Sequence, residues 1–149
     1  MAEKEEGVRF RIKELDDLGY TFQKPEESIP TERIDYAMEN KVDIDSEEST
    51  ITFVLNPKFT TGKRDPKLIA ELIFKVVFDV QGMENIIEED EERVTLPEQL
   101  IVTLFSISYS TMRGVFFEKS RGTMAERLII PIIDPKTIMQ GGETSENDD

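Results

Sequence analysis

Apolar and polar residues alternate in three successive segments of the chain, which predicts three β-strands. In residues 34–45, 50–55 and 68–80 one face is mostly apolar, and from Leu68 to Val80 all seven positions on one face are apolar. A strand sends successive side chains to opposite faces, so a period of two indicates strands rather than a helix. Short polar turns between sequential strands favour an antiparallel meander.

The N-terminal region carries a shorter version of the same pattern. Apolar and basic residues alternate over residues 8–13, which predicts a short strand. Residues 14–31 are mostly polar and include two prolines, which are typical of a long connection or an extended arm. We therefore expect residues 1–31 to form an N-terminal strand and arm, residues 32–139 the main domain, and residues 140–149 a disordered acidic tail.

A long helix is predicted in the second half of the chain. Thr95 and Glu98 have the spacing of a capping box, and Gly122 provides a stop signal, so the predicted helix spans residues 96–119. Its apolar residues cover more than one side, whereas one sheet face can cover only one. The remaining apolar surface needs a partner subunit or a bound chain. The sequence thus predicts an α+β fold, an antiparallel β-sheet meander of about four strands with one long helix packed on one face.

The composition excludes several kinds of catalytic site. The 149 residues include no Cys and no His, so zinc sites built from them, Cys nucleophiles and His-based triads are impossible. Residues 61–63 read Thr-Gly-Lys, but the first glycine and the final Ser or Thr of a phosphate loop are missing. Carboxylates are abundant, and no pair stands out as a general acid and base. We therefore expect no enzymatic activity, no cofactor and no metal.

Charge and hydropathy restrict the partners and the location. The formal net charge is −14, which argues against nucleic acid and anionic lipid, because both attract clustered Lys and Arg. Residues 1–6 lack the apolar stretch of a secretory signal. Residues 100–117 are interrupted by serines and an arginine, which is not typical of a membrane span. We expect a cytoplasmic protein that does not insert into membranes and whose partners are neutral or basic.

A series of short motifs in the second half of the chain resembles a known family. Leu96-Pro97 opens the predicted helix, and residues 106–114 read Ser-Ile-Ser-Tyr-Ser-Thr-Met-Arg-Gly. Gly122-Thr123 follows, and residues 128–135 read Leu-Ile-Ile-Pro-Ile-Ile-Asp-Pro. Placed after three amphipathic strands, these motifs resemble the SecB family of protein-export chaperones and its SecB-like relatives over about residues 32–139.

The resemblance implies a fold, an assembly and a function. Family members have a four-stranded antiparallel sheet with a long helix on one face, and they form dimers of dimers with the helices between the sheets. The fourth strand would come from residues 8–13 or from another part of the N-terminal arm. Members bind unfolded polypeptides in apolar grooves and pass them to the export ATPase.

The expected function is therefore an ATP-independent molecular chaperone, a holdase that binds unfolded or partly folded polypeptides, including preproteins for export. Its expected partners are these polypeptides, the export ATPase and further copies of the chain in a dimer or tetramer. The alternative is a non-catalytic oligomeric interaction module, or a chaperone dedicated to one cognate partner such as an antitoxin.

Six residues are candidates for contact with a client or a second subunit. They are Phe53, Phe59, Met112, Arg113, Phe116 and Phe117. For Phe53 the burial tendency of phenylalanine favours ordinary core. Phe116 and Phe117 are adjacent and point in different directions on a helix, so one can be core while the other faces a partner. Arg113 either pairs with a carboxylate across an interface or extends to water.

The apolar segment 129–133 is interrupted by Pro131, which excludes a central strand or the interior of a helix. An extended segment lying in a groove is expected. It can serve either as a structural plug or as the wall of a binding groove, and the plug is favoured.

Overall fold

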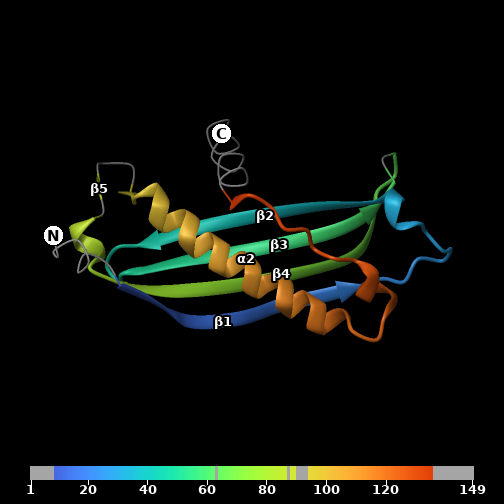
Figure 1. Cartoon of the computed structure of the whole chain (residues 1–149), viewed down its shortest axis with the longest axis horizontal. Helices are drawn as coiled ribbons and strands as arrows, with labels where there is room; N and C mark the ends of the chain where they lie inside the picture. The colour runs from blue at the N-terminus through green and yellow to red at the C-terminus, as the bar shows by residue number, and fades with distance from the viewer. Residues whose placement is uncertain (1–8, 63, 87, 90–93, 136–149) are drawn as a thin grey trace.

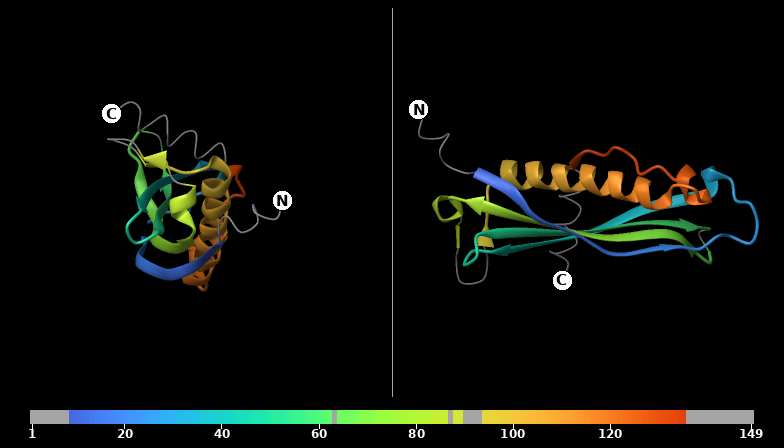
Figure 2. Two further views of the ribbon diagram at one scale, coloured as in Figure 1. Left: turned by 90° about the vertical axis from the view of Figure 1, so that its left-hand side faces the viewer. Right: turned by 90° about the horizontal axis from the view of Figure 1, so that it is seen from below.

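A computed structural model describes residues 9–62, 64–86, 88–89 and 94–135. In this part of the chain, a four-stranded antiparallel sheet carries a long helix on one face (Figure 1, Figure 2), so the predicted α+β fold is confirmed. The strands lie in the order β1-β4-β3-β2, with β1 and β2 at the two edges. The bounds are Arg9–Phe22 for β1, Ile34–Asp45 for β2, Thr50–Thr61 for β3, Lys67–Gln81 for β4, Glu88–Glu89 and Val94–Thr95 for the small pair β5 and β6, and Glu98–Ser120 for α2.

The core lies between the sheet and α2. On β3 the residues Ile51, Phe53 and Leu55 are fully buried, and they lie opposite three buried residues of β4 in the antiparallel register. The helix contributes a buried row with helical spacing, consisting of Leu104, Phe105, Ser108, Tyr109, Met112, Phe116 and Ser120. Burial of the apolar side chains of this row against the sheet stabilises the fold.

Strand β3 is longer than predicted. Residues 56–61 continue the strand, although Asn56-Pro57 reads as the start of a loop. Proline lacks the N–H that a central strand normally donates. The side-chain amide of Asn56 donates to the carbonyl oxygen of Leu72 at 2.8 Å, so a carbonyl of β4 beside this interruption still receives a hydrogen bond. The prediction of a loop here was wrong because a side chain replaced a backbone donor.

Strand β1 supplies the fourth strand and is also longer than the predicted residues 8–13. It pairs antiparallel with β4 as far as Phe22, with register shifts at Lys13 and Leu18. Each bulge inserts one residue and reverses the phase of the alternation. Residues 14–22 therefore did not show a single period of two and looked like an arm. Residues 23–33 then cross to the opposite edge of the sheet, where β2 begins (Figure 1).

Helix α2 begins two residues later than predicted and ends one residue later. Its N-cap is Pro97, which makes no side-chain capping hydrogen bond, so the predicted capping box with Thr95 at the N-cap was wrong. Helix α2 is long and apolar enough to cross a membrane, but core helices often have the same length and composition. In this structure α2 packs on the sheet. It crosses the sheet diagonally, from the β2 side at its start to the β1 side at its end (Figure 1).

Candidate functional site

The chain returns along α2 after a turn of 3-10 helix, η3, at Met124–Arg127 (Figure 1). We call residues 128–133 the strap. The hydroxyl of Tyr109 donates to the carbonyl oxygen of Pro131 at 2.8 Å, and Nε of Arg113 donates to that of Ile130 at 3.1 Å. Tyr109 and Arg113 are four residues apart and lie on the same side of the helix. They hold two successive carbonyls, so the strap is anchored in an extended form without belonging to the sheet.

A second tyrosine supports this anchor from the sheet. The hydroxyl of Tyr36, on β2, lies 3.1 Å from that of Tyr109. Because the proton of Tyr109 is directed to Pro131, Tyr36 donates in this pair. Burial raises the pKa of both tyrosines, and for Tyr36 the hydrogen bond to Tyr109 raises the pKa further. The two neutral tyrosine hydroxyl groups therefore link β2, α2 and the strap through successive hydrogen bonds.

An apolar groove runs between the strap and the second half of α2. It encloses a cavity of about 330 Å³. Small residues of α2, Ser110 and Gly114, form one side, and a Cβ added at Gly114 would meet nothing within 4 Å. The large side chains at the rim are exposed, with Phe117 at 56% and Ile129 at 73%. The lining residues are Ser110, Arg113, Gly114, Phe116, Phe117, Leu128, Ile129 and Ile130.

The chemistry of the groove suits an apolar guest. Arg113 is the only ionisable residue in its lining, and Nε of this side chain already donates to the strap. The exposed rim offers only hydrocarbon surface, and the missing side chain of Gly114 leaves space for an incoming group. Such a groove can bury apolar side chains of an extended polypeptide.

Four of the predicted contact residues lie in the core instead. Phe53 and Met112 are 0% exposed, Phe116 is 1% exposed and Phe59 is 5% exposed. The rings of Phe59 and Phe116 pack on each other with centroids 5.6 Å apart, and the ring of Phe53 packs on those of Phe78 and Phe105. Ordinary core is therefore the correct interpretation of Phe53, and these four side chains are not accessible to a client. Hydrophobicity alone could not separate them from surface residues.

Three predicted residues line the groove, and they are Arg113, Phe117 and the buried Phe116. Phe117 is exposed while its neighbour Phe116 is buried, which confirms that the two phenylalanines serve different sides of the helix. Arg113 lines the groove, but its Nε binds the carbonyl oxygen of Ile130, whereas a partner carboxylate or open water was predicted. The backbone of the strap thus supplies an acceptor that no sequence pattern revealed, and pairing of Arg113 with a partner carboxylate stays a prediction.

The strap serves both as a plug and as a groove wall. Leu128 and Ile130 are buried and cover part of the apolar surface of α2 for which a partner was predicted. Ile129 and Ile132 are exposed, the latter at 82%. The sequence did not identify these two exposed residues, because every neighbour in this run is also apolar and alternation cannot be read from it. The apolar surface of α2 that lacks cover is thus smaller than predicted, and at the groove it is represented by the exposed Phe117.

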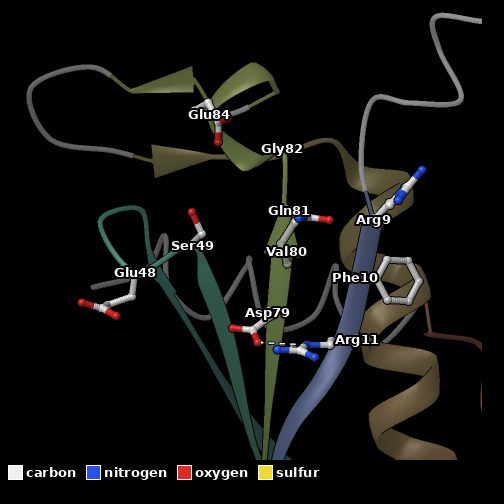
Figure 3. Close-up of a pocket in the computed structure, with 10 residues that line it drawn as sticks. All are labelled: Arg9, Phe10, Arg11, Glu48, Ser49, Asp79, Val80, Gln81, Gly82 and Glu84. Carbon is white, nitrogen blue, oxygen red and sulfur yellow. Dashed lines mark hydrogen bonds and ion pairs between the residues drawn. The ribbon is translucent and has the colours of Figure 1, made fainter.

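A larger cavity of about 560 Å³ opens at one end of the sheet (Figure 3). Its walls carry charges of both signs, and Arg11 forms an ion pair with Asp79 at 3.2 Å. This mixed and partly neutralised surface does not select an anion or a cation, and it is less apolar than the groove. The lining residues are Arg9, Phe10, Arg11, Glu48, Ser49, Asp79, Val80, Gln81, Gly82 and Glu84.

Comparison with known proteins gives distant structural similarity. The chain is similar to a SecB-like chaperone of Mycobacterium tuberculosis, solved with a peptide of the HigA1 antitoxin, at 14% identity over 83% of this chain and 87% of that chain, with a TM-score of 0.47. It is also similar to a protein of unknown function from Streptococcus agalactiae, at 13% identity over 85% of this chain and 96% of that chain, with a TM-score of 0.41. No family model matches the sequence, and no curated protein matches it. The function is therefore argued from the groove itself.

Proposed function

We propose that this protein is an ATP-independent holdase, which binds unfolded or partly folded polypeptides through the groove between α2 and the strap. The observation that carries the proposal is the open apolar groove, with Phe117 and Ile129 exposed at its rim and Gly114 unfilled at its side. Exposed apolar surface beside a preformed groove is typical of a protein-binding site. The residue pattern that resembles the SecB family supports the same class of function.

The size of the groove favours weak and reversible binding. Complete burial of one Phe or Ile side chain contributes about 1.5–3 kcal/mol. The rim side chains are already partly covered, and association itself has an entropic cost, so only a modest net affinity remains. A client held by such contacts dissociates without nucleotide hydrolysis. Release then follows from competition, either by a downstream partner or by folding of the client.

The charge of the chain adds a preference among clients. With a net charge of −14, the protein repels acidic polypeptides and attracts basic ones over the range of the Debye length. The groove supplies apolar contacts while the acidic surface favours encounters with cationic segments. Basic, aggregation-prone polypeptides are therefore the expected client class, and binding of them should weaken as the salt concentration rises.

Light scattering of an aggregating unfolded protein tests the proposal. The wild-type chain should suppress the rise in scattering, and Phe117→Ser should suppress it less, because this change removes apolar surface at the groove rim. Leu18→Ser is the matched control, since Leu18 is 49% exposed but lies on β1, outside the groove. Absence of suppression by the wild-type chain at several-fold molar excess would refute the holdase, and equal loss in both variants would refute the groove as its site.

A dedicated chaperone and a general holdase differ in the range of clients that they bind. A chaperone dedicated to one cognate partner, such as an antitoxin, would yield a single stoichiometric partner in a pull-down and would leave generic aggregation unchanged. A general holdase would yield many clients, and delivery to an export ATPase would add that enzyme. A homo-oligomer that shares α2 between subunits is also proposed, and the exposed Ser110 and Gly114 would permit close approach of another helix.

A further inference from the structure

Part of the Arg113 side chain has no partner in the fold. A guanidinium carries five N–H donors, and Nε of Arg113 donates to the carbonyl oxygen of Ile130 at 3.1 Å. The two Nη groups form no hydrogen bond or ion pair with any residue of 9–62, 64–86, 88–89 and 94–135, the ranges that the structure describes. Arg113 and Ile130 both line the groove, so the remaining donors lie at its wall.

The groove lining contains no carboxylate that could satisfy these donors. Arg113 is the one charged residue of the lining, and the other lining residues are apolar or small. A carboxylate accepts two parallel N–H bonds from a guanidinium, and such charge-assisted bonds are roughly twice as strong as those between neutral groups. The Coulomb attraction is also larger beside hydrocarbon than in open water. A carboxylate is therefore the ligand group that fits this side chain best.

The space beside Arg113 suits a single apolar side chain. Gly114 follows Arg113 in α2, and a Cβ added at Gly114 would meet no atom within 4 Å. Phe117 lies one turn further along the same side of the helix as Arg113 and is exposed. The cavity of about 330 Å³ is at the lower end of the range for ligand pockets, which is roughly 300–1,000 Å³. The groove thus joins one cation to a small apolar space.

We propose that the groove captures the C-terminal end of a client polypeptide whose last residue is apolar. This inference rests on the proposed use of the groove for clients, and it specifies which part of a client enters the groove. The terminal carboxylate binds the Nη groups of Arg113, while the side chain of the last residue fills the space at Gly114 and contacts Phe117 at the rim. Capture of a terminal carboxylate by fixed N–H donors is a recurrent mode of peptide recognition.

A chain end fits this arrangement better than an acidic side chain does. In the last residue of a polypeptide, the carboxylate and the side chain are bonded to the same Cα atom, so both can reach one small cavity. In an extended segment the neighbours of a Glu or Asp point to the opposite side, and the next side chain on the same side is about 6–7 Å away. An internal acidic residue would therefore leave either Arg113 or the space at Gly114 without its partner.

The charge of the protein restricts the rest of such a client. At physiological salt the net charge of −14 repels an acidic chain over about 8 Å of solution, whereas a partly buried pair with Arg113 is screened much less. Clients with a basic body and an apolar last residue satisfy both conditions. Each client has one C-terminus, so one groove holds one client chain in this mode.

Fluorescence polarisation with matched peptides tests the capture of a chain end by the full-length protein. The probe is a short, basic, unstructured peptide that ends in leucine and carries a fluorophore at its N-terminus. The free acid should bind about tenfold more tightly than the C-terminal amide, as expected for one charge-assisted pair. An amide with Glu before the final leucine has the charge of the free acid and should bind like the plain amide. A free acid that ends in serine should bind more weakly than the one that ends in leucine.

The ratio of acid affinity to amide affinity isolates the contribution of Arg113. Arg113→Gln also removes the Nε bond to the strap, which weakens both peptides alike, so only lost carboxylate binding removes the difference between acid and amide. Arg127→Gln is the matched control, because Arg127 lies on η3 outside the groove lining, and it should keep the wild-type ratio. Circular dichroism should show that both variants are folded, and the comparison of peptides on the wild type needs no variant.

The outcomes that contradict capture of a chain end differ from those that contradict the holdase. Equal binding of acid and amide by the wild type would overturn the capture, while suppression of client aggregation would still support the holdase. Tight binding of the amide with Glu would assign the site to any carboxylate, and a preference for the acid that survives Arg113→Gln would exclude Arg113 as its partner. Displacement of the probe by less decanoate than unlabelled free acid would assign the groove to fatty acids. Binding of neither peptide would also overturn the capture, and light scattering then decides on the holdase separately.

Discussion

Gly114 is a residue whose replacement should affect stability and client binding in opposite directions. It lies on the exposed side of α2, lines the groove, and an added Cβ would meet no atom within 4 Å. Glycine in the interior of a helix costs about 0.8–1.0 kcal/mol relative to alanine, and leucine is nearly as good a helix former as alanine. Nothing in the packing of the described chain requires glycine here. We therefore expect a role in admitting a guest.

The substitution Gly114→Leu should stabilise the free protein and impair its function. Helix propensity alone should raise the free energy of unfolding by about 0.5–1 kcal/mol. For a chain of this size that gain corresponds to an increase of about 1–4 °C in Tm. The leucine side chain would occupy part of the 330 Å³ cavity, so suppression of client aggregation should fall.

Two assays and one control test this reasoning. Urea unfolding gives the free energy of unfolding, and light scattering of an aggregating client gives the holding capacity. Gly19→Ala is the control, since a Cβ at Gly19 also meets nothing within 4 Å, but the residue lies on β1. It should not reduce holding. Unchanged holding by Gly114→Leu would show that the groove is not the client site, and a loss of stability would contradict the open space at this position.

Three further predictions concern the tyrosines, of which Tyr109 is buried and Tyr20 and Tyr36 are half-buried. Tyr20→Phe should raise the free energy of unfolding in urea by about 1 kcal/mol, because its buried hydroxyl has no hydrogen-bond partner in the described structure; a decrease would imply a partner. Tyr109→Phe should lower the free energy of unfolding by about 1–2 kcal/mol and speed hydrogen exchange in the strap, because it removes the hydrogen bond to Pro131. Tyr36→Phe keeps that hydrogen bond and should lower the free energy of unfolding by less. Burial raises the pKa of all three tyrosines above 10, so stability to urea should be full below pH 10 and fall as pH rises further; constant stability through tyrosinate formation would contradict this.

The sequence predicted the fold well where one physical effect dominated. The alternation in β2 and β4 and the helical spacing in α2 each reflect one long, continuous buried face. Predictions failed where local exceptions were compensated by tertiary contacts. The bulges of β1 reversed the alternation of apolar and polar residues. Beside Pro57, the side-chain amide of Asn56 donates a hydrogen bond to the carbonyl oxygen of Leu72 on β4. Neither compensation can be read from a periodic pattern.

The candidate site was only partly predictable for a related reason. Phe117 and Arg113 were identified, but Phe53 and Met112 belong to the core, because an apolar residue has the same signature in a core and at an interface. Exposure of Ile129 depends on how the strap lies against α2. That arrangement is set by hydrogen bonds from two helix side chains to backbone carbonyls, which leave no trace in composition or spacing.

A single label in the groove gives the most direct test of polypeptide binding at this site. The natural chain has no cysteine, so Ser110→Cys introduces one thiol at the groove with little change in size, and Ser46→Cys introduces one at the exposed turn after β2. Each carries an environment-sensitive fluorophore and is titrated with a permanently unfolded polypeptide. We expect a saturable emission shift at position 110 and none at position 46. Equal shifts at both positions, or none at position 110, would contradict binding in the groove.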